Sequence, residues 1–297
     1  CALKIIAELN VKTLIIVHKE FLLRQWVERI EQFLPDAKVG RLQGPTIDIE
    51  GKDIVIGMLQ SLSMKDYEIE LFKSFGLTIV DECHHIGAEV FSRALFKVVT
   101  KYTLGLSATM KRKDGLTKVI KMFLGNVVVK KEREGKEKVC VKTINYEVVD
   151  EDFNRIELNF RGQTHYSKMI KKLCEFNPRR DFILTVLEKI LKADKERESQ
   201  IMILGHNRNL LTYLHDAIKY RGLATVGYYV GGMKEEDLKI SEGKQVVIAT
   251  YAMAEEGLDI KTLTTLIMAT PKTDVTQAVG RILRKKKEDR DKIPLII

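Results

Sequence analysis

The strongest constraint on the fold is a series of short runs of apolar, largely β-branched residues, each followed at once by polar side chains. These runs include VKTLIIVH (11–18), FGLTIVDE (75–82), SQIMILGH (199–206) and KQVVIAT (244–250). An unbroken apolar run of this length is typical of a strand buried on both faces, as in a parallel sheet. We therefore expect parallel sheets with helices on both faces, which places the chain in the α/β class.

Helical patterns fill the gaps between these runs. One covers residues 19–34 and is ended by Pro35, and another covers 207–222 and is closed by Gly222. Further helices are expected near 66–75 and over 164–195. Strands and helices in alternation predict βαβ units.

The alternation weakens after Gly125, where the charged stretch KKEREGKEK is typical of a solvated turn or a linker. We therefore expect two α/β lobes, residues 1–130 and 146–297, joined by a linker over 131–145. Both ends are expected to be cut. The chain starts at Cys1 inside a helical pattern that has no N-cap, and it ends in KIPLII, which has the pattern of a buried strand.

The stretch VDECHH (80–85) places two carboxylates, a thiol and two imidazoles directly after a strand. A metal-binding tract is one explanation, but adjacent residues of an extended chain point to opposite faces, and the sequence has no C-x₂₋₄-C pair. A polar loop is another. Ligands of open α/β sheets bind beyond the carboxyl ends of the strands. Asp81 and Glu82 are therefore the first candidates for catalytic residues.

The net charge of +9 and the pI near 9.2 favour a polyanionic partner, nucleic acid before a membrane surface, although many ordinary soluble proteins are equally basic. No apolar run approaches the roughly 18 residues that a membrane span needs. The four cysteines are scattered along the chain, which indicates reduced thiols in an intracellular protein.

Taken in order, several stretches resemble the motifs of superfamily 2 helicases and translocases, and they cover nearly the whole chain. DECHH (81–85) resembles motif II, of the DECH-box type within the DEAD/DEAH-like group, and SAT (107–109) resembles motif III. The later stretches VVIATYAMAEEGLDI (246–260) and QAVGRILR (277–284) resemble motifs V and VI. IIVHKEFLLRQW (15–26) is similar to motif Ia, and IVIGMLQSL (54–62) is similar to the nucleic-acid-contacting segment that follows it.

This resemblance implies two RecA-like domains, with ATP and nucleic acid at the interdomain cleft. Residues 1–130 would be the helicase ATP-binding domain and residues 146–297 the helicase C-terminal domain. The resemblance also implies hydrolysis of ATP with Mg²⁺. Asp81 would hold the metal and Glu82 would be the general base, against the alternative that both acids cap a helix.

The remaining site residues follow from the same resemblance. Arg281 and Arg284, which share one helix face, would be arginine fingers, against the alternative of a solvated basic face like the following RKKKEDRDK. The other expected residues are Gln277, Gly257, Asp259 and Gly280 at the nucleotide, His84, Ser107 and Thr109 in coupling, and His18, Gln60, Ser61 and Thr250 at the nucleic acid. Cys83, His85 and Trp26 are expected to pack rather than to act.

One motif is missing from the sequence. No G-x-x-x-x-G-K-[ST] loop, the phosphate-binding motif I, occurs in it. The expectation is that this loop lies just upstream of Cys1 and that the chain alone hydrolyses almost no ATP.

The sequence thus predicts a nucleic-acid-dependent ATPase, a helicase or translocase. DNA is favoured over RNA, because DECHH with a glutamine-type motif VI is more similar to the DNA-directed branch. Two alternatives stay open: a nucleic-acid-binding module that does not hydrolyse ATP, and a nucleic-acid sensor that uses ATP as a switch.

Overall fold

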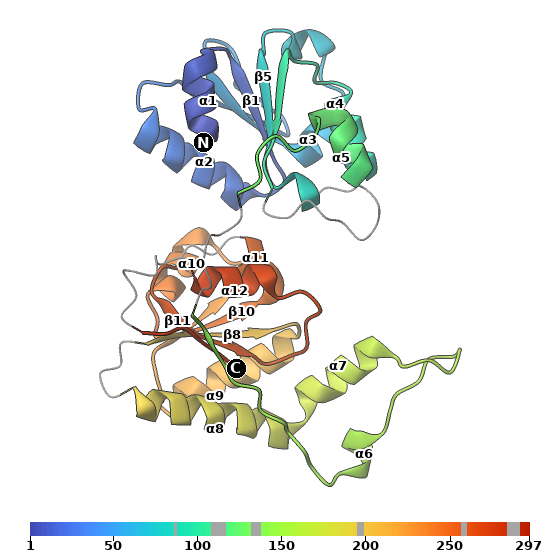
Figure 1. Cartoon of the computed structure of the whole chain (residues 1–297), viewed down its shortest axis with the longest axis vertical. Coiled ribbons are helices and arrows are strands. Elements are labelled where there is room, and N and C mark those ends of the chain that lie inside the picture. Colours follow the sequence, from blue (N-terminus) through green and yellow to red (C-terminus); the bar gives the residue numbers. More distant parts are fainter. Residues whose placement is uncertain (86–87, 108–116, 132–137, 195–198, 257–259, 284–291) are drawn as a thin grey trace. The chain divides into compact units, whose positions relative to one another are not determined.

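Each of the two units of the computed structural model, Cys1–Arg133 and Glu134–Ile297, is built around one sheet with helices packed on it (Figure 1). The structure describes residues 1–85, 88–107, 117–131, 138–194, 199–256, 260–283 and 292–297. Within these residues, no helix is both long and apolar enough to cross a bilayer.

The sheet of unit 1 has the strand order β3-β2-β4-β1-β5-β6. Every neighbouring pair is parallel except β2 and β3. Its strands are β1 (Thr13–Val17), β2 (Val39–Gln43), β3 (Thr46–Ile47), β4 (Ile54–Met58), β5 (Leu77–Val80) and β6 (Tyr102–Gly105). The helices of this unit are α1 (Ala2–Leu9), α2 (Glu20–Phe33), α3 (Leu59–Met64), α4 (Ala88–Leu95) and α5 (Thr117–Leu124), with 3₁₀ turns at Ile69–Phe72 and Cys83–His85.

The sheet of unit 2 has the order β7-β12-β11-β8-β10-β9, and its strands all pair in parallel. The strands are β7 (Cys140–Val141), β8 (Gln200–Gly205), β9 (Val226–Tyr229), β10 (Val246–Thr250), β11 (Leu263–Met268) and β12 (Leu295–Ile296). The helices are α6 (Glu151–Asn154), α7 (Tyr166–Glu175), α8 (Asn177–Ala193), α9 (Arg208–Tyr220), α10 (Glu235–Glu242), α11 (Tyr251–Glu256) and α12 (Thr276–Ile282).

The central strands are buried on both faces, as their apolar runs predict. In β1, Leu14 and Ile16 belong to one core cluster and Ile15 and Val17 to another, because successive side chains of a strand point to opposite faces. The residues of β8 divide in the same way between two clusters of unit 2. The prediction of an α/β fold with mainly parallel sheets is confirmed.

One predicted helix is wrong. Instead of a helix near 66–75, the structure has α3 directly after β4 and only a 3₁₀ turn at Ile69–Phe72. Leu59 and Leu62, three residues apart, bury one side of α3, whereas Phe72 and Phe75 are the residues of the later stretch that reach the core. Strand β2 was not predicted, because only alternate residues of it are buried.

Candidate functional site

The carboxyl ends of the parallel strands β1, β4, β5 and β6 lie on one edge of the unit 1 sheet. Asp81 continues β5 beyond its last residue, and its N–H donates to the carbonyl of Ile16 at 3.0 Å. His18 follows β1, and its carbonyl accepts a hydrogen bond from the Gln60 amide at 2.7 Å. Residues from four separate strand ends therefore meet along this edge.

Two hydrogen bonds fix the carboxylate of Asp81. The indole N–H of Trp26 on α2 donates to Oδ2 at 2.8 Å, and the backbone N–H of Glu82 donates to Oδ1 at 2.9 Å. Burial raises the pKa of Asp81 above its ordinary value, and the two hydrogen bonds act in the opposite direction. The two hydrogen bonds thus orient both carboxylate oxygens of Asp81. They also stabilise its ionised form against the effect of burial.

Glu82 has a strained backbone. Its φ of 47° lies in the left-handed region, which costs a residue with a side chain about 1–2 kcal/mol. Strain of this kind gathers at functional sites, where the surrounding structure holds it in place. The Oε2 atom of Glu82 lies 3.3 Å from Nδ1 of His84, and the same ring nitrogen lies 2.9 Å from the Ser107 hydroxyl. The buried His84 imidazole therefore connects the acid after β5 with the hydroxyl after β6.

Cys83 lies between these polar residues but faces the core. It is 1% exposed and belongs to an apolar cluster of unit 1. Burial, followed by the charge of Glu82, raises the pKa of the Cys83 thiol to about 11. The thiol is protonated at neutral pH, so Cys83 contributes packing rather than nucleophilic chemistry.

Unit 2 also gathers polar side chains where its parallel strands end. His206 follows β8, Tyr251 follows β10 and Thr270 follows β11. The Tyr251 hydroxyl donates to the Thr270 carbonyl at 2.6 Å, and Nδ1 of His206 lies 2.9 Å from the Thr270 hydroxyl. The rings of His206 and Tyr251 are 4.8 Å apart. These contacts tie the ends of three strands together.

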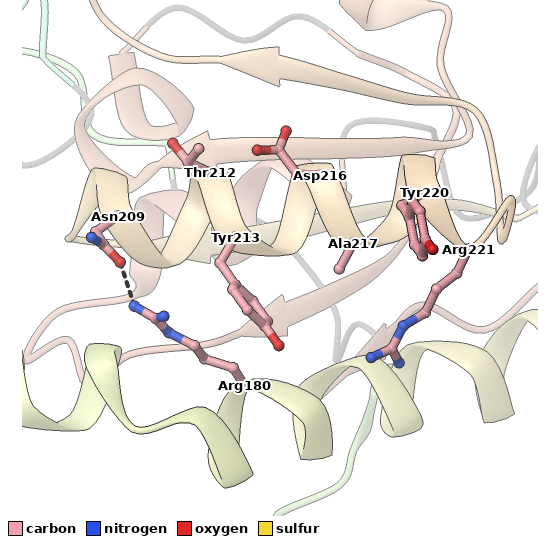
Figure 2. Close-up of a pocket in the computed structure, with 8 residues that line it drawn as sticks. All are labelled: Arg180, Asn209, Thr212, Tyr213, Asp216, Ala217, Tyr220 and Arg221. Atoms are coloured by element: carbon pink, nitrogen blue, oxygen red, sulfur yellow. Dashed lines mark hydrogen bonds between the residues drawn. The ribbon is translucent and has the colours of Figure 1, made fainter.

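A groove of about 720 Å³ in unit 2 is lined by Arg180 of α8 and by residues of α9 (Figure 2). Arg180 in this groove donates to Asn209 and to the carbonyl of Cys174. Arg221 is paired with Asp181. The guanidinium groups of Arg180 and Arg221 thus already have partners within the protein. The groove is therefore a poorer candidate for binding a charged ligand than the strand ends are.

Two known families match separate parts of the chain. Residues 1–112 match the family described as type III restriction enzyme, res subunit, and residues 182–286 match the helicase conserved C-terminal domain. The two matches together cover most of the chain and support its resemblance to superfamily 2 of the helicases and translocases.

The relatives of the chain carry helicase and translocase names. It is 36% identical over its whole length to the putative ATP-dependent RNA helicase L396 of Acanthamoeba polyphaga mimivirus, of which it covers 56%. It is 27% identical over 97% of its length to the DNA 3'-5' translocase XPB2 of Sulfurisphaera tokodaii, of which it covers 72%. The chain thus spans only about half the length of the mimivirus relative.

A solved structure shows the same fold. The helicase Lhr of Mycobacterium smegmatis, bound to ssDNA and AMP-PNP, matches 97% of this chain and 39% of its own, with a TM-score of 0.57 at 15% identity. Its RecA-like domains agree with the fold expected for a superfamily 2 chain.

Some of the residues expected from the superfamily 2 motifs come together in the structure and others do not. Asp81, Glu82, His84 and Ser107 form one connected group. Ser61 lies in the first turns of α3 rather than at a strand end, and its hydroxyl accepts from the N–H of Gly44 at 2.9 Å.

The expected residues of unit 2 are less completely described. The Thr250 hydroxyl accepts from the N–H of Met253 at 3.4 Å, at the start of α11. Gln277 and Gly280 lie on α12, where a Cβ at Gly280 would meet no described atom within 4 Å. The others, Thr109, Gly257, Asp259, Arg284 and the side chain of Arg281, lie outside the described residues.

A divalent cation fits Asp81, because carboxylate oxygens are the ligands that Mg²⁺ prefers. The described residues contain no group of three or more His, Cys, Asp or Glu side chains that could hold a metal ion. An ion that arrives on ATP needs only one or two carboxylates, since phosphates and water complete its shell. Asp81 at the end of β5 could supply such a carboxylate.

Four residues of these sites were not predicted as site residues: Trp26, His206, Tyr251 and Thr270. Trp26 has the spacing of a core residue and does pack beside the apolar cluster that contains Leu22 and Ile30. Its bond to a residue 55 positions away follows from the pairing of β1 with β5, which no local pattern encodes. His206 and Thr270 could have been found as the first polar residues after predicted strands.

We predict that Trp26→Phe destabilises the protein in a pH-dependent way. The variant keeps an aromatic ring but loses a hydrogen bond to a charged group, for which about 1–3 kcal/mol of unfolding free energy is typical. The bond stabilises ionised Asp81, so its loss raises the pKa of Asp81 further. The destabilisation is full where Asp81 is ionised and disappears as the pH falls through the raised pKa of Asp81. Urea unfolding followed by circular dichroism at several pH values measures it, and a loss that does not vary with pH would exclude the bond.

Proposed function

We propose that the chain is the motor portion of an ATP-dependent helicase or translocase that acts on nucleic acid. The observation that carries this proposal is the connected group at the end of β5. Asp81 is fixed by Trp26, and a strained Glu82 lies against His84. The resemblance to superfamily 2 supports the same reaction class.

In the proposed reaction, Asp81 holds the Mg²⁺ of Mg·ATP and Glu82 orients the attacking water and accepts its proton. The metal supplies positive charge at the phosphates. His84 keeps the Glu82 carboxylate in place. The His84 ring also contacts the Ser107 hydroxyl, so a change at Glu82 can reach Ser107 through it. Gly257, Asp259, Gln277 and Gly280 would contact the nucleotide, and Arg281 and Arg284 would stabilise the charge of the transition state.

We further propose the domain assignment 1–130 for the ATP-binding domain, 131–145 for a linker and 146–297 for the C-terminal helicase domain. The family matches over 1–112 and 182–286 lie inside these domains. The division of the structure at Arg133 lies inside the proposed linker.

The proposed substrate is DNA, contacted through its phosphates by His18, Gln60, Ser61 and Thr250. The glutamine-type motif VI and the relative named as a DNA translocase favour it. RNA is the second candidate, because the relative with 36% identity is named as an RNA helicase. Hydroxyl and amide groups suit phosphates of either polymer.

We predict that the protein with its natural ends hydrolyses ATP, and that DNA stimulates the rate more than RNA of the same length and sequence. Steady-state phosphate release in the presence of each polymer measures this. A larger stimulation by RNA would reverse the choice of substrate. No stimulation by either polymer would contradict a nucleic-acid motor and favour a binding module.

The site assignment is tested in the same assay with Glu82→Gln. The variant loses the base but no ligand of phosphate or metal, so hydrolysis should fall by about 10²–10⁴-fold while ATP binding persists. Glu89→Gln is the matched control, because Glu89 is an exposed glutamate of the same unit that pairs with Arg93 on the helix surface. Equal rates for the two variants would remove Glu82 from the mechanism.

We predict that Arg281→Ala lowers the ATPase rate at saturating nucleic acid by about 10³-fold, whereas Lys286→Ala leaves it nearly unchanged. An arginine finger stabilises the charge of the transition state, which nucleic-acid saturation does not replace. A solvated basic face would act through nucleic-acid affinity alone. Similar rates for the two variants at saturation would therefore contradict the finger assignment.

A further inference from the structure

A small hairpin stands between α6 and α7 of unit 2, outside all the superfamily motifs (Figure 1). The N–H of His165 donates to the carbonyl of Glu157 at 2.7 Å, and the N–H of Asn159 donates to the carbonyl of Gln163 at 2.8 Å. Leu158 and Thr164 form an antiparallel bridge. We call residues 157–165 the hairpin and residues 159–163 its tip.

The tip has a defined conformation. The side-chain oxygen of Asn159 accepts from the N–H groups of Arg161 at 2.9 Å and Gln163 at 3.0 Å. Gly162 adopts a φ of 71°, which glycine reaches without steric cost. The backbone of the tip is therefore defined before any ligand arrives, and with it the direction in which the side chains of Phe160 and Arg161 leave the chain.

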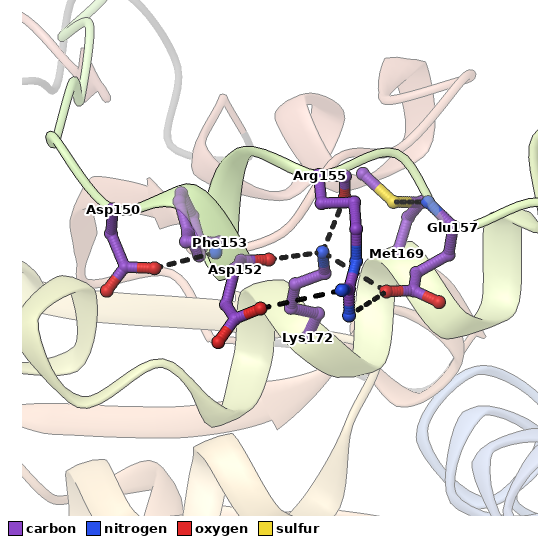
Figure 3. Close-up of polar contacts among 7 residues, drawn as sticks. All are labelled: Asp150, Asp152, Phe153, Arg155, Glu157, Met169 and Lys172. Atoms are coloured by element: carbon purple, nitrogen blue, oxygen red, sulfur yellow. Dashed lines mark hydrogen bonds and ion pairs between the residues drawn. The ribbon is translucent and has the colours of Figure 1, made fainter.

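The hairpin is also firmly attached to unit 2 (Figure 3). Lys172 on α7 donates to the carbonyl of Asp152 at 2.6 Å and lies 3.3 Å from the Glu157 carboxylate. The N–H of Glu157 donates to the sulfur of Met169 at 3.3 Å. Next to the hairpin in the sequence, the ring of Phe153 on α6 stacks on Phe176, the residue between α7 and α8, with centroids 4.2 Å apart. These contacts join the hairpin to α7 and through it to the core.

The tip exposes an aromatic ring to solvent. Phe160 is 93% exposed, and Tyr166 beside the hairpin is 61% exposed. The Arg161 guanidinium lies 5.2 Å from the centre of the Phe160 ring. The exposed Phe160 ring, with a cation beside it, adds little to the core and is accessible to a ligand.

The cations near the tip are only partly paired. Lys172 pairs with Glu157 and Lys171 with Glu175, whereas Arg161 and Lys168 form no ion pair with a described residue. From Leu158 to Cys174 the chain carries Arg161, Lys168, Lys171 and Lys172 and no Asp or Glu. An aromatic ring for stacking, flanked by arginine and lysine, is the combination that binds single-stranded nucleic acid without reading its sequence. A purely apolar partner would leave Arg161 and Lys168, which have no ion-pair partner among the described residues, without a complement.

We propose that the hairpin is a second nucleic-acid contact, at which an unpaired base stacks on Phe160 while Arg161 and Lys168 contact the adjacent phosphates. This inference rests on the proposed function, because it adds a contact to the same motor. It assigns to residues 157–168 a role that the motifs do not include.

The test compares Phe160→Ala with Tyr220→Ala in the whole chain, with affinity for labelled single-stranded dT and rU oligonucleotides measured by fluorescence anisotropy. Tyr220 is an aromatic residue of the same unit with the same 93% exposure. Loss of one stacked base weakens binding by roughly 5- to 100-fold, without changing the salt dependence. Arg161→Ala should instead reduce the log–log salt slope by about 0.7. The two oligonucleotides distinguish DNA from RNA.

The outcomes separate this inference from the proposed function. If the wild type binds and Phe160→Ala binds equally well, the hairpin contact is wrong and the motor proposal stands. If the wild type binds neither oligonucleotide, both the hairpin contact and the motor proposal are wrong. If the wild type self-associates and Phe160→Ala abolishes that alone, the tip is a protein contact.

A second measurement follows the stacking itself. Phe160→Trp and Tyr220→Trp each add an exposed indole to a chain that has one tryptophan. Stacking of a base on the ring should quench the added emission of Phe160→Trp when the oligonucleotide binds, and leave that of Tyr220→Trp unchanged. Equal responses of the two variants would overturn the proposed stacking.

Discussion

In unit 1, β1 pairs with β4 on one side and β5 on the other, and the three strands run parallel. Parallel strands end at the same edge, so the polar residues that follow them are brought together although they are far apart in the sequence. The pairing of Ile16 with Val80 places Asp81 beside the start of α2, which follows β1 directly. The bond from Trp26 to Asp81 depends on this register, because a slip by one residue turns every side chain of a strand to the other face.

The site at the end of β5 reduces the stability of the protein in two ways. Burial disfavours the ionised form of Asp81, and Glu82 holds a left-handed backbone. Trp26 and the backbone of Glu82 offset part of this with hydrogen bonds to the carboxylate. The core beneath, with Leu14, Ile16 and Val80 fully buried, is rigid enough to keep the strained arrangement. Such a trade of stability for geometry is common where charged groups do chemistry.

Much of the fold could be predicted from local patterns. The runs that form β1, β5, β8 and β10 are too apolar for anything but buried strands, and Gly222 ends α9 with a φ of 61°, as its position predicts. Strand β2 was not predicted because only alternate residues of it are fully buried. The stretch near 66–75 was predicted to be a helix where only a 3₁₀ turn forms. Local spacing does not include the tertiary contacts that decide such cases.

The candidate site, too, could be predicted only in part from local patterns. Asp81 and Glu82 were found from a polar stretch after a strand, and His84 from the resemblance to motif II. The partner of Asp81 on α2 was not found, because that contact depends on the whole sheet. Asn159 is a second example. Its side chain accepts two backbone hydrogen bonds that shape the hairpin tip, and no pattern in the sequence predicts them.

The most direct test of the account uses Trp26, the only tryptophan of the chain, which donates to the carboxylate proposed to hold Mg²⁺. The measurement is the emission of Trp26 during a titration with Mg·ATP in the protein with its natural ends. We predict a saturable change that requires Mg²⁺ and ATP together and that Asp81→Ala abolishes. An emission spectrum that stays constant while ATP is bound would contradict the assignment of Asp81 to the metal, and with it the central claim.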